Sequence, residues 1–489
     1  MAITNIITDL SPLAAWLSHA DAWKTATSQS AIDDGTNHRI VRWDSQATAT
    51  LQLAQATANS QPKFVGASRI NEFPALCFEN SSNAGANVGM TVTLGSAVGN
   101  RSSTFIIVSD SPHRQEHTTA GRNAMVGITG AGRGGIAIHR GLVKLIDAGA
   151  DGATGDLTTP STVDSGLRMP QGRSILVVRA GNGTTDANYT VWSNKRKTTV
   201  ALRASATSTN FILGASTGPN NPWTGRMYAV YVWNSALTDT QIGDAIDNLS
   251  GVYNVNTNPD YNLIVVGDSI SSSGPLAAGT GGYVVPLDVS WPTILSNQLG
   301  GQVTVHNCST SSQTAEGIEG DFTNIVTPAI ITSNGAGLKS PVNIMCMFIG
   351  TNDITNNSKT ANEVEQYWRS IIGYARARGV SKVIGIPCIP RATAALSIMN
   401  DFNTALVANY RSWGIDYIVP IAGTPLTFVP KSVASADLNR LLYHTDSTHL
   451  YAQGMPYVAN EVLKCLKTNL GIGSEERVVS SRGRSWGVR

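Results

Sequence analysis

The sequence predicts a multidomain protein with an antiparallel β-sandwich in its N-terminal half and a three-layer α/β/α fold around a parallel sheet in its C-terminal half. Before residue 255, short apolar runs alternate and are separated by Gly, Asn, Ser and Thr, which is typical of antiparallel strands. After about residue 260, apolar runs alternate with amphipathic helical segments, which indicates a parallel sheet covered on both faces. We therefore place the sandwich at residues 1–256, the α/β domain at 257–470 and an Arg/Ser-rich tail at 471–489.

Strands of the N-terminal half are expected where apolar and polar residues alternate, at 104–110, 135–141, 174–180, 188–194, 210–216 and 226–234. In the last of these, alternation places Met227, Ala229, Tyr231 and Trp233 on one face of a central strand. The segment 235–249 follows it, and Thr238 with Gln241 forms a capping box. A short helix is therefore predicted to seal the sandwich.

A glycine motif in this half has a simpler explanation than cofactor binding. Gly130, Gly132 and Gly135 match GxGxxG, but a dinucleotide site needs a helix after the glycines. Residues 136–139 instead alternate, and an apolar run returns after Gly141. We interpret this segment as a β-hairpin.

Parallel strands of the C-terminal half are expected at 263–266, 342–349, 382–386 and 416–419. A helix with a Thr360–Glu363 capping box and a stop at Gly379 lies between the second and the third, and another covers 398–413. Ligands of such sheets bind beyond the carboxyl ends of the strands.

The composition narrows the classes of function. Hydrophobic residues make up 42% of the 489 residues and charged residues only 14%, with a net charge of +2. Without a dense basic block, nucleic acid is not an expected partner, and the apolar stretches are too short for membrane insertion. The segment MAITNIITDL does not have the pattern of a signal peptide.

The five cysteines are widely spaced and form no CxxC pair, so neither a zinc site nor a disulfide scaffold is indicated. Cys346 and Cys388 lie in apolar runs and are expected to be buried thiols.

Three polar motifs of the C-terminal half supply the groups that a catalytic site with a serine nucleophile needs. Ser269 lies just past the first parallel strand, and a serine hydroxyl becomes a nucleophile only when a base accepts its proton. The segment Asp446-Ser447-Thr448-His449 supplies an imidazole with a carboxylate able to orient it. Asn352 follows the second parallel strand, where its amide can donate to an oxyanion.

The motifs GDSI, GTND and DSTH, in this order, resemble blocks I, III and V of the SGNH (GDSL) hydrolases over residues 260–468. The resemblance implies Ser269 as the nucleophile, His449 as the base and Asp446 as its orienter. It implies the Ser269 backbone N–H, Ser312 and Asn352 as the oxyanion hole. Ser312 stands where block II of the family has glycine. The serines that follow Ser269 are expected to form a flexible loop, and the implied ester hydrolysis needs no metal or organic cofactor.

Residues 9–253 resemble concanavalin-like (laminin-G-like) lectin domains, whose fold is a jelly roll. The resemblance depends on SPLAAWLSHADAW, VRWDS, QPKF, PALCFEN and WTGRMYAVYVWNSALTDTQI. An SGNH domain joined to such a sandwich resembles carbohydrate esterases, which implies removal of O-acetyl groups from a bacterial surface polysaccharide. The arrangement also resembles bacteriophage tail spikes and fibres, which implies an extracellular, virion-tail location, a homotrimer and other tail proteins as partners.

Other functions stay open at this point. A general carboxylesterase or lipase would use the same three residues, and a glycan-binding adhesin would have an inert SGNH domain. A depolymerase that cleaves glycan chains is a weaker alternative, because no carboxylate pair stands out.

Overall fold

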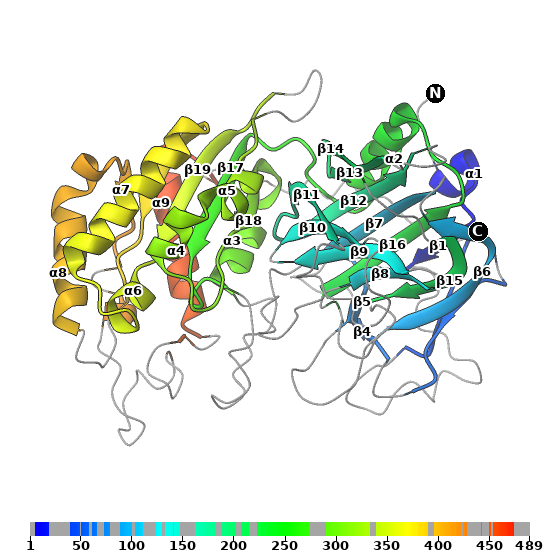
Figure 1. Cartoon of the computed structure of the whole chain (residues 1–489), viewed down its shortest axis with the longest axis horizontal. Coiled ribbons are helices and arrows are strands. Elements are labelled where there is room, and N and C mark those ends of the chain that lie inside the picture. The colour runs from blue at the N-terminus through cyan, green and yellow to red at the C-terminus, as the bar shows by residue number, and fades with distance from the viewer. Residues whose placement is uncertain are drawn as a thin grey trace.

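The computed structural model describes residues 5–18, 40–48, 50–57, 61–65, 73–78, 89–99, 103–110, 124–129, 133–139, 141–146, 162–181, 188–201, 207–214, 223, 225–272, 290–332, 339–389, 396–421, 424–427, 442, 449–450 and 453–473. Two antiparallel sheets form one half of the molecule, and a parallel sheet with helices forms the other (Figure 1). The predicted change of architecture near residue 255 therefore corresponds to a change from antiparallel to parallel pairing.

The first antiparallel sheet has the order β14-β13-β12-β7-β16-β5-β4, and β1 also pairs with β16. Its strands are β1 (Ala14–Leu17), β4 (Lys63–Val65), β5 (Ala75–Phe78), β7 (Thr104–Asp110), β12 (Arg173–Ala180), β13 (Asn188–Ser193), β14 (Arg196–Ala201) and β16 (Gly225–Trp233). The second has the order β11-β10-β9-β8-β15-β6-β3-β2. Its strands are β2 (Arg42–Asp44), β3 (Gln52–Ala54), β6 (Met90–Gly99), β8 (Ala124–Thr129), β9 (Arg133–His139), β10 (Leu142–Ile146), β11 (Thr162–Arg168) and β15 (Thr207–Leu213). Strands β9 and β10 pair as the expected hairpin.

The two sheets share one hydrophobic core, as a sandwich requires. Phe105 of the first sheet stacks on Phe211 of the second, with ring centroids 6.2 Å apart, and Trp16 stacks on the same ring at 5.7 Å. The other face of the first sheet is also covered, because α1 (Ile6–Leu10) and α2 (Asp239–Val252) contribute Ile6 and Ile242 to a second core. The predicted helix that seals the sandwich is therefore present.

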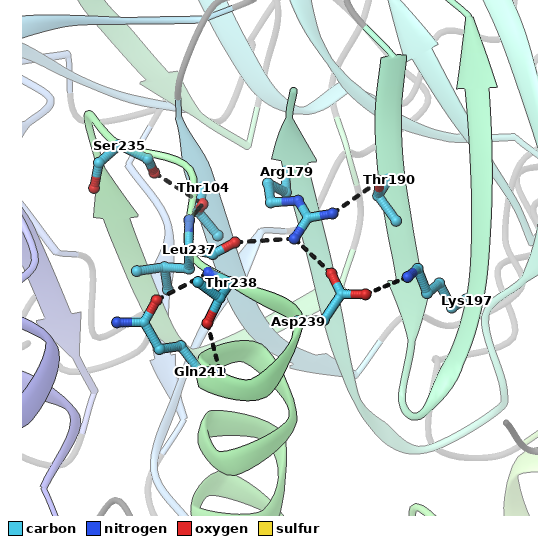
Figure 2. A network of polar contacts seen from close by, with 9 residues as sticks. All are labelled: Thr104, Arg179, Thr190, Lys197, Ser235, Leu237, Thr238, Asp239 and Gln241. Carbon is cyan, nitrogen blue, oxygen red and sulfur yellow. Dashed lines mark hydrogen bonds and ion pairs between the residues drawn. The ribbon is translucent and has the colours of Figure 1, made fainter. Parts of the chain in front are cut away.

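Helix α2 begins with the predicted capping box, in which Thr238 N–H donates to Gln241 Oε1 at 2.9 Å and Gln241 N–H donates to Thr238 Oγ1 at 3.2 Å. Figure 2 shows how this end is tied to the sheet. Arg179 donates to the Leu237 carbonyl at 3.0 Å and to Asp239 at 2.6 Å, and Lys197 contacts the other oxygen of Asp239. The hydrogen bond from Lys197, with that from Arg179, lowers the pKa of Asp239.

The predicted faces of the 226–234 strand were wrong at two positions, Met227 and Tyr228, which alternation places on each other's face. Met227 packs in the core between the sheets, whereas Tyr228, Ala229, Tyr231 and Trp233 pack against the helices. A register shift in the pairing with β7 lies between Met227 and Ala229. One extra residue in a bulge moves the following side chains to the opposite face, and alternation in the sequence does not reveal it.

The parallel sheet has the order β18-β17-β19-β20-β21. Its strands are β17 (Tyr261–Gly267), β18 (Val303–Asn307), β19 (Val342–Phe348), β20 (Val380–Gly385) and β21 (Tyr417–Ile418). Four of them lie at the predicted places. Strand β18 was missed, because its sequence VTVHN is short and contains polar residues.

Helices cover both faces of this sheet, as expected for a three-layer fold. On one face, Leu263 and Val265 pack with α3 (Trp291–Leu299) and α9 (Met455–Leu470). On the other, Ile264 and Val266 pack with α4 (Ala315–Gly320), α5 (Phe322–Ile325), α7 (Ala361–Ala377) and α8 (Leu396–Asn409). The remaining described elements are helix α6 (Thr351–Thr355) and the 3-10 helices η3 (Gly300–Gln302), η4 (Thr327–Ala329), η5 (Tyr410–Trp413) and η6 (Pro425–Thr427).

Residues of the sandwich bind directly to the edge of the parallel sheet. Gln171 N–H donates to the carbonyl of Val305 in the edge strand β18 at 2.6 Å. The buried Arg168 donates to the carbonyls of Asn307 at 3.3 Å and Ile325 at 2.8 Å. Arg196 donates to the Pro328 carbonyl at 3.3 Å, and burial lowers its pKa to about 10. The sandwich thus supplies donors to the Val305 and Asn307 carbonyls of β18, which an exposed sheet edge would leave to water. The other two carbonyls belong to α5 and η4.

The five cysteines are buried free thiols, including Cys346 and Cys388 as predicted. Among the described residues, no helix is long and apolar enough to cross a membrane. The predicted tail overlaps the described residues only at 471–473, where Gly471 caps α9 in a left-handed conformation.

Candidate active site

The centre of the parallel sheet brings two predicted site residues to one edge. Strand β17 pairs with β18 on one side and with β19 on the other, so the order reverses between β17 and β19. Ligands of open parallel sheets bind at this reversal, beyond the carboxyl ends of the strands. Ser269 follows the end of β17, and Asn352 follows the end of β19.

The chain turns sharply after β17 and places Ser269 in that turn. The carbonyl of Asp268 accepts from Ser271 N–H at 3.0 Å and from Ser272 N–H at 2.9 Å, and its carboxylate accepts from Ile270 N–H at 2.9 Å. Gly267 has no room for a side chain, because an added Cβ would lie 2.6 Å from Ser271 Oγ. The glycine and aspartate of GDSI therefore shape the turn that presents the serine.

Ser269 and His449 meet across the fold, although they lie 180 positions apart in the sequence. The distance from His449 Nε2 to Ser269 Oγ is 2.7 Å, and the contact is only partly buried. This is the geometry in which an imidazole can accept the serine proton. Asp446, the predicted orienter of His449, lies outside the described residues.

Asn352 is held so that its amide faces the loop before α4. Its Oδ1 accepts from Asn356 Nδ2 at 3.0 Å, and its Nδ2 donates to the Gln313 carbonyl at 3.0 Å. An amide nitrogen carries two hydrogens, so one more donor is available. Gly350, two residues before Asn352, has a φ of 128°, a region that disfavours other residues.

Ser312 lies in the loop between β18 and α4, with an exposed side chain and a φ of 59°. This is the left-handed conformation that glycine adopts at least cost. The serine therefore retains the backbone conformation that a glycine at this position would favour. Its backbone N–H is retained as well, which is the group an oxyanion hole needs.

Asp353 is a site residue that the sequence analysis did not single out. Its buried carboxylate accepts from Ala315 N–H at 2.8 Å and from Glu316 N–H at 3.2 Å, at the start of α4. Thr314 caps the same helix through Gly317 N–H at 2.9 Å. Burial raises the pKa of Asp353, although the two N–H bonds oppose the shift. Asp353 thus fastens the loop containing Ser312 to the segment containing Asn352, and its place beside Asn352 in GTND was the available signal.

The serines after Ser269 do not begin as a flexible loop. Ser271 is fully buried, its Oγ accepts from Trp291 Nε1 at 3.1 Å, and its carbonyl accepts from Asn307 Nδ2 at 2.8 Å. Ser272 is buried as well. The prediction was wrong for these two residues because their partners come from distant segments, whereas Ser273 lies outside the described residues.

His306 is a structural histidine rather than a second candidate base. It is buried on β18, where its Nδ1 lies 2.7 Å from Asn262 Oδ1, and burial lowers its pKa well below the usual value. In the described part of the chain, no three His, Cys, Asp or Glu side chains are grouped closely enough to hold a metal ion.

Residues 265–455 match the model of the GDSL-like Lipase/Acylhydrolase family. The C-terminal part of the chain therefore contains a GDSL (SGNH) hydrolase domain, the domain of an ester hydrolase.

Solved structures with similarity to this chain include a member of the lipolytic protein G-D-S-L family from Veillonella parvula. The two sequences are 18% identical and the TM-score is 0.32, and the match covers 43% of this chain and 100% of that one. The acetylxylan esterase Axe2 from Geobacillus stearothermophilus has 15% identity and a TM-score of 0.31, and the match covers 43% of this chain and 95% of that one. The esterase EstA from Pseudoalteromonas sp. has 12% identity and a TM-score of 0.32, over 43% and 100% of the two chains. No curated protein matches the sequence.

Proposed function

We propose that this protein is a serine esterase whose nucleophile is Ser269 and whose general base is His449. The observation that carries the proposal is the 2.7 Å distance between His449 Nε2 and Ser269 Oγ, at the carboxyl edge of the sheet. Asp446 is assigned to orient the imidazole, on the strength of the DSTH motif. The family match over residues 265–455 supports the same chemistry.

The reaction proceeds in two steps. Ser269 Oγ bonds to the ester carbonyl carbon while its proton passes to His449 Nε2, and the imidazolium then protonates the departing alcohol oxygen. A water molecule, deprotonated by His449, attacks the acyl-enzyme, and Ser269 regains its proton as the acid leaves. The backbone N–H groups of Ser269 and Ser312 and the amide of Asn352 donate to the oxyanion, and each such donor contributes about 2.7–4 kcal/mol to transition-state stabilisation.

The substrate we propose is an O-acetylated bacterial surface polysaccharide. The support is the resemblance of residues 9–253 to concanavalin-like lectin domains, joined here to a hydrolase domain. The described strands of this half form two packed antiparallel sheets, which agrees with such a jelly roll at the level of architecture. In this proposal the sandwich binds glycan or supports assembly.

The same arrangement supports a role as a bacteriophage tail spike or tail fibre protein. Homotrimer formation, contacts with other tail proteins and an extracellular, virion-tail location belong to this proposal. Light scattering of the purified chain tests the trimer, because a monomer of 51.6 kDa and its trimer are readily separated.

The decisive experiment measures acetate release from an O-acetylated bacterial polysaccharide, with polymer length followed in parallel. Ser269→Ala is compared with wild type and with the control Ser412→Ala, an exposed serine in η5. We expect wild type and Ser412→Ala to release acetate without shortening the polymer, and Ser269→Ala to lose at least about 10³-fold in rate.

The alternatives give different results in the same assays. Hydrolysis of aryl acetates and long-chain esters without polysaccharide deacetylation would indicate a general carboxylesterase or lipase. Saturable glycan binding without any Ser269-dependent hydrolysis would indicate an inert adhesin, and a falling polymer length would indicate a depolymerase.

A further inference from the structure

A short segment of the sandwich, residues 168–171, reaches the hydrolase domain from a fixed position in its own sheets. Arg168 is the last residue of β11, and Gln171 lies between β11 and β12. Arg168 pairs with Leu142 of β10, and its carbonyl accepts from Ser193 Oγ of β13 at 3.3 Å. The segment is therefore fastened to both sheets of the sandwich, and its side chains carry that position into the neighbouring domain.

The buried side chain of Arg168 joins two elements of the hydrolase domain. Its Nη1 donates to the carbonyl of Asn307, the last residue of β18, at 3.3 Å. Its Nη2 donates to the carbonyl of Ile325, the last residue of α5, at 2.8 Å. A guanidinium presents its donors in a rigid planar fork, so one side chain fixes the distance between these two carbonyls.

Asn307 extends this constraint to two parts of the candidate site. Its Nδ2 donates to the carbonyl of Ser271, two residues after Ser269, at 2.8 Å. Its Oδ1 accepts from Ser309 N–H at 3.0 Å, in the loop that continues to Ser312. Both bonds are buried, and buried hydrogen bonds with good partners make their surroundings rigid.

Gln171 fastens a second support of the same turn, helix α3. Thr293 Oγ1 donates to Gln171 Oε1 at 3.0 Å, and Ser296 Oγ donates to the Gln171 carbonyl at 3.3 Å. Trp291, the first residue of α3, donates from Nε1 to Ser271 Oγ at 3.1 Å. Ser271 is thus held at its carbonyl from β18 and at its hydroxyl from α3, and both of these elements bind the sandwich.

We infer that Arg168 is a positioning residue for the reaction, which acts through Asn307 on the turn that carries Ser269 and on the loop that carries Ser312. The inference rests on the proposed esterase function and adds that the rate depends on a side chain of the sandwich. A displacement of about 1 Å at the reacting groups can lower a rate by about 10²-fold. Because α3 still holds the turn when Arg168 is removed, we expect a loss at or below that size.

The test compares wild type with Arg168→Met, Arg168→Lys and the matched control Arg196→Met, all in the full chain. Arg196 is also a sandwich arginine that donates to two backbone carbonyls of the hydrolase domain, those of Pro328 at 3.3 Å and Ile330 at 3.5 Å. Both methionine variants therefore remove an interdomain guanidinium, but only one of them removes the contact with Asn307. Denaturant unfolding of each variant separates a loss of stability from a loss of positioning.

Two measurements report on the site. Steady-state hydrolysis of an aryl acetate gives kcat and KM, and hydrogen exchange is followed at the amides of Ser271 and Ser272, which donate to the Asp268 carbonyl. We expect Arg168→Met to lower kcat by about 10–100-fold with KM nearly unchanged, and to speed this exchange by at least about tenfold. Arg168→Lys should keep part of kcat, because its ammonium donates but lacks the planar fork, and Arg196→Met should leave kcat and this exchange at wild-type values.

A double-mutant cycle with Asn307→Ala tests the route of the effect. Residues of one network do not have additive effects, so adding Arg168→Met to Asn307→Ala should lower kcat by less than about threefold further. Additive losses, or kcat and exchange in Arg168→Met equal to those of Arg196→Met, overturn the inference. If Arg168→Met does not fold, Arg168→Lys gives the same comparison, with a smaller loss expected.

The exchange measurement separates this inference from the proposed function, because it needs no activity. A wild-type chain that hydrolyses no ester overturns the proposed esterase, and faster exchange in Arg168→Met alone then still supports the positioning of the turn. An active chain whose kcat is insensitive to Arg168 retains the esterase and overturns the positioning role.

Discussion

Replacing Asp353 by alanine should reduce both stability and turnover, because its carboxylate holds the start of α4 against the segment containing Asn352. The substitution removes the acceptor of two backbone N–H groups, those of Ala315 at 2.8 Å and Glu316 at 3.2 Å. A buried N–H left without an acceptor costs about 1–3 kcal/mol. The Ala315 bond is buried and the Glu316 bond is partly buried, so water replaces only the second acceptor. We expect the free energy of unfolding to fall by about 2–3 kcal/mol.

The effect on turnover follows from the proposed oxyanion hole. Once released, the loop no longer fixes the Ser312 N–H, and the Gln313 carbonyl no longer orients the Asn352 amide. Losing one oxyanion donor lowers kcat by about 10²–10³. We therefore expect kcat for an aryl acetate to fall by about 10²-fold with little change in KM. Asp353→Asn should have a free energy of unfolding and a kcat between those of wild type and Asp353→Ala. Its carbonyl oxygen still accepts from one backbone N–H, whereas its NH₂ group faces the other N–H.

Denaturant unfolding and steady-state kinetics, measured well below the unfolding temperature, check both effects. Asp321→Ala is the matched control, because Asp321 precedes the neighbouring helix α5, is exposed, and its carboxylate accepts from Asn324 Nδ2 at 2.6 Å. An Asp353→Ala protein that matches this control in unfolding free energy and kcat would refute the reasoning. Lower stability with normal kcat would leave Asp353 a structural cap only.

Three further predictions concern single residues. Asn352→Ala should lower kcat for an aryl acetate by about 10²–10³ and leave KM nearly unchanged, and an equal rise in KM would argue for a substrate-binding role. Ser312→Gly should raise the free energy of unfolding by up to about 1 kcal/mol. A serine in the left-handed conformation costs about 1–2 kcal/mol, and the greater entropy of glycine in the unfolded chain offsets part of the gain from removing that cost. A variant less stable than wild type contradicts this prediction. Burial raises the pKa of Asp416, but the Val383 N–H and Arg376 outweigh it, so the pKa lies below its usual value of 3.8. Asp416 thus stabilises the fold above that pH and loses this contribution as pH falls, and Asp416→Asn should show a weaker acid dependence of unfolding than wild type.

Much of the architecture could be predicted because it depends on local patterns. The capping boxes at Thr238 and Thr360 lie within four residues of sequence, and both are present. Buried strands such as β17 are continuous apolar runs that stand out from their flanks. Strand β18 has no such signal, because its polar residues find partners elsewhere in the fold, as His306 does on Asn262.

The motifs of the candidate site could be predicted from the sequence, but the contacts that hold its residues in place could not. Ser269 and His449 were identified from short motifs, and their contact is a tertiary result. The left-handed backbone of Ser312 depends on the loop around it, and no pattern in the sequence encodes it. The place of Asp353 beside Asn352 in GTND marked it as a candidate, but its partners are N–H groups 37 and 38 positions away, which only the folded chain reveals.

The contacts of Arg168 limit how the two domains of such a protein can be exchanged for others. Its guanidinium binds the carbonyl of Asn307, whose own side chain binds the Ser271 carbonyl two residues after the proposed nucleophile. A hydrolase domain cut from the sandwich would lose this donor, and a foreign module grafted in its place would have to supply another. Exchange of the sandwich in evolution or engineering is therefore also a change to the framework of the hydrolase domain. A working chimera should carry the β11 end and its arginine along with the enzyme.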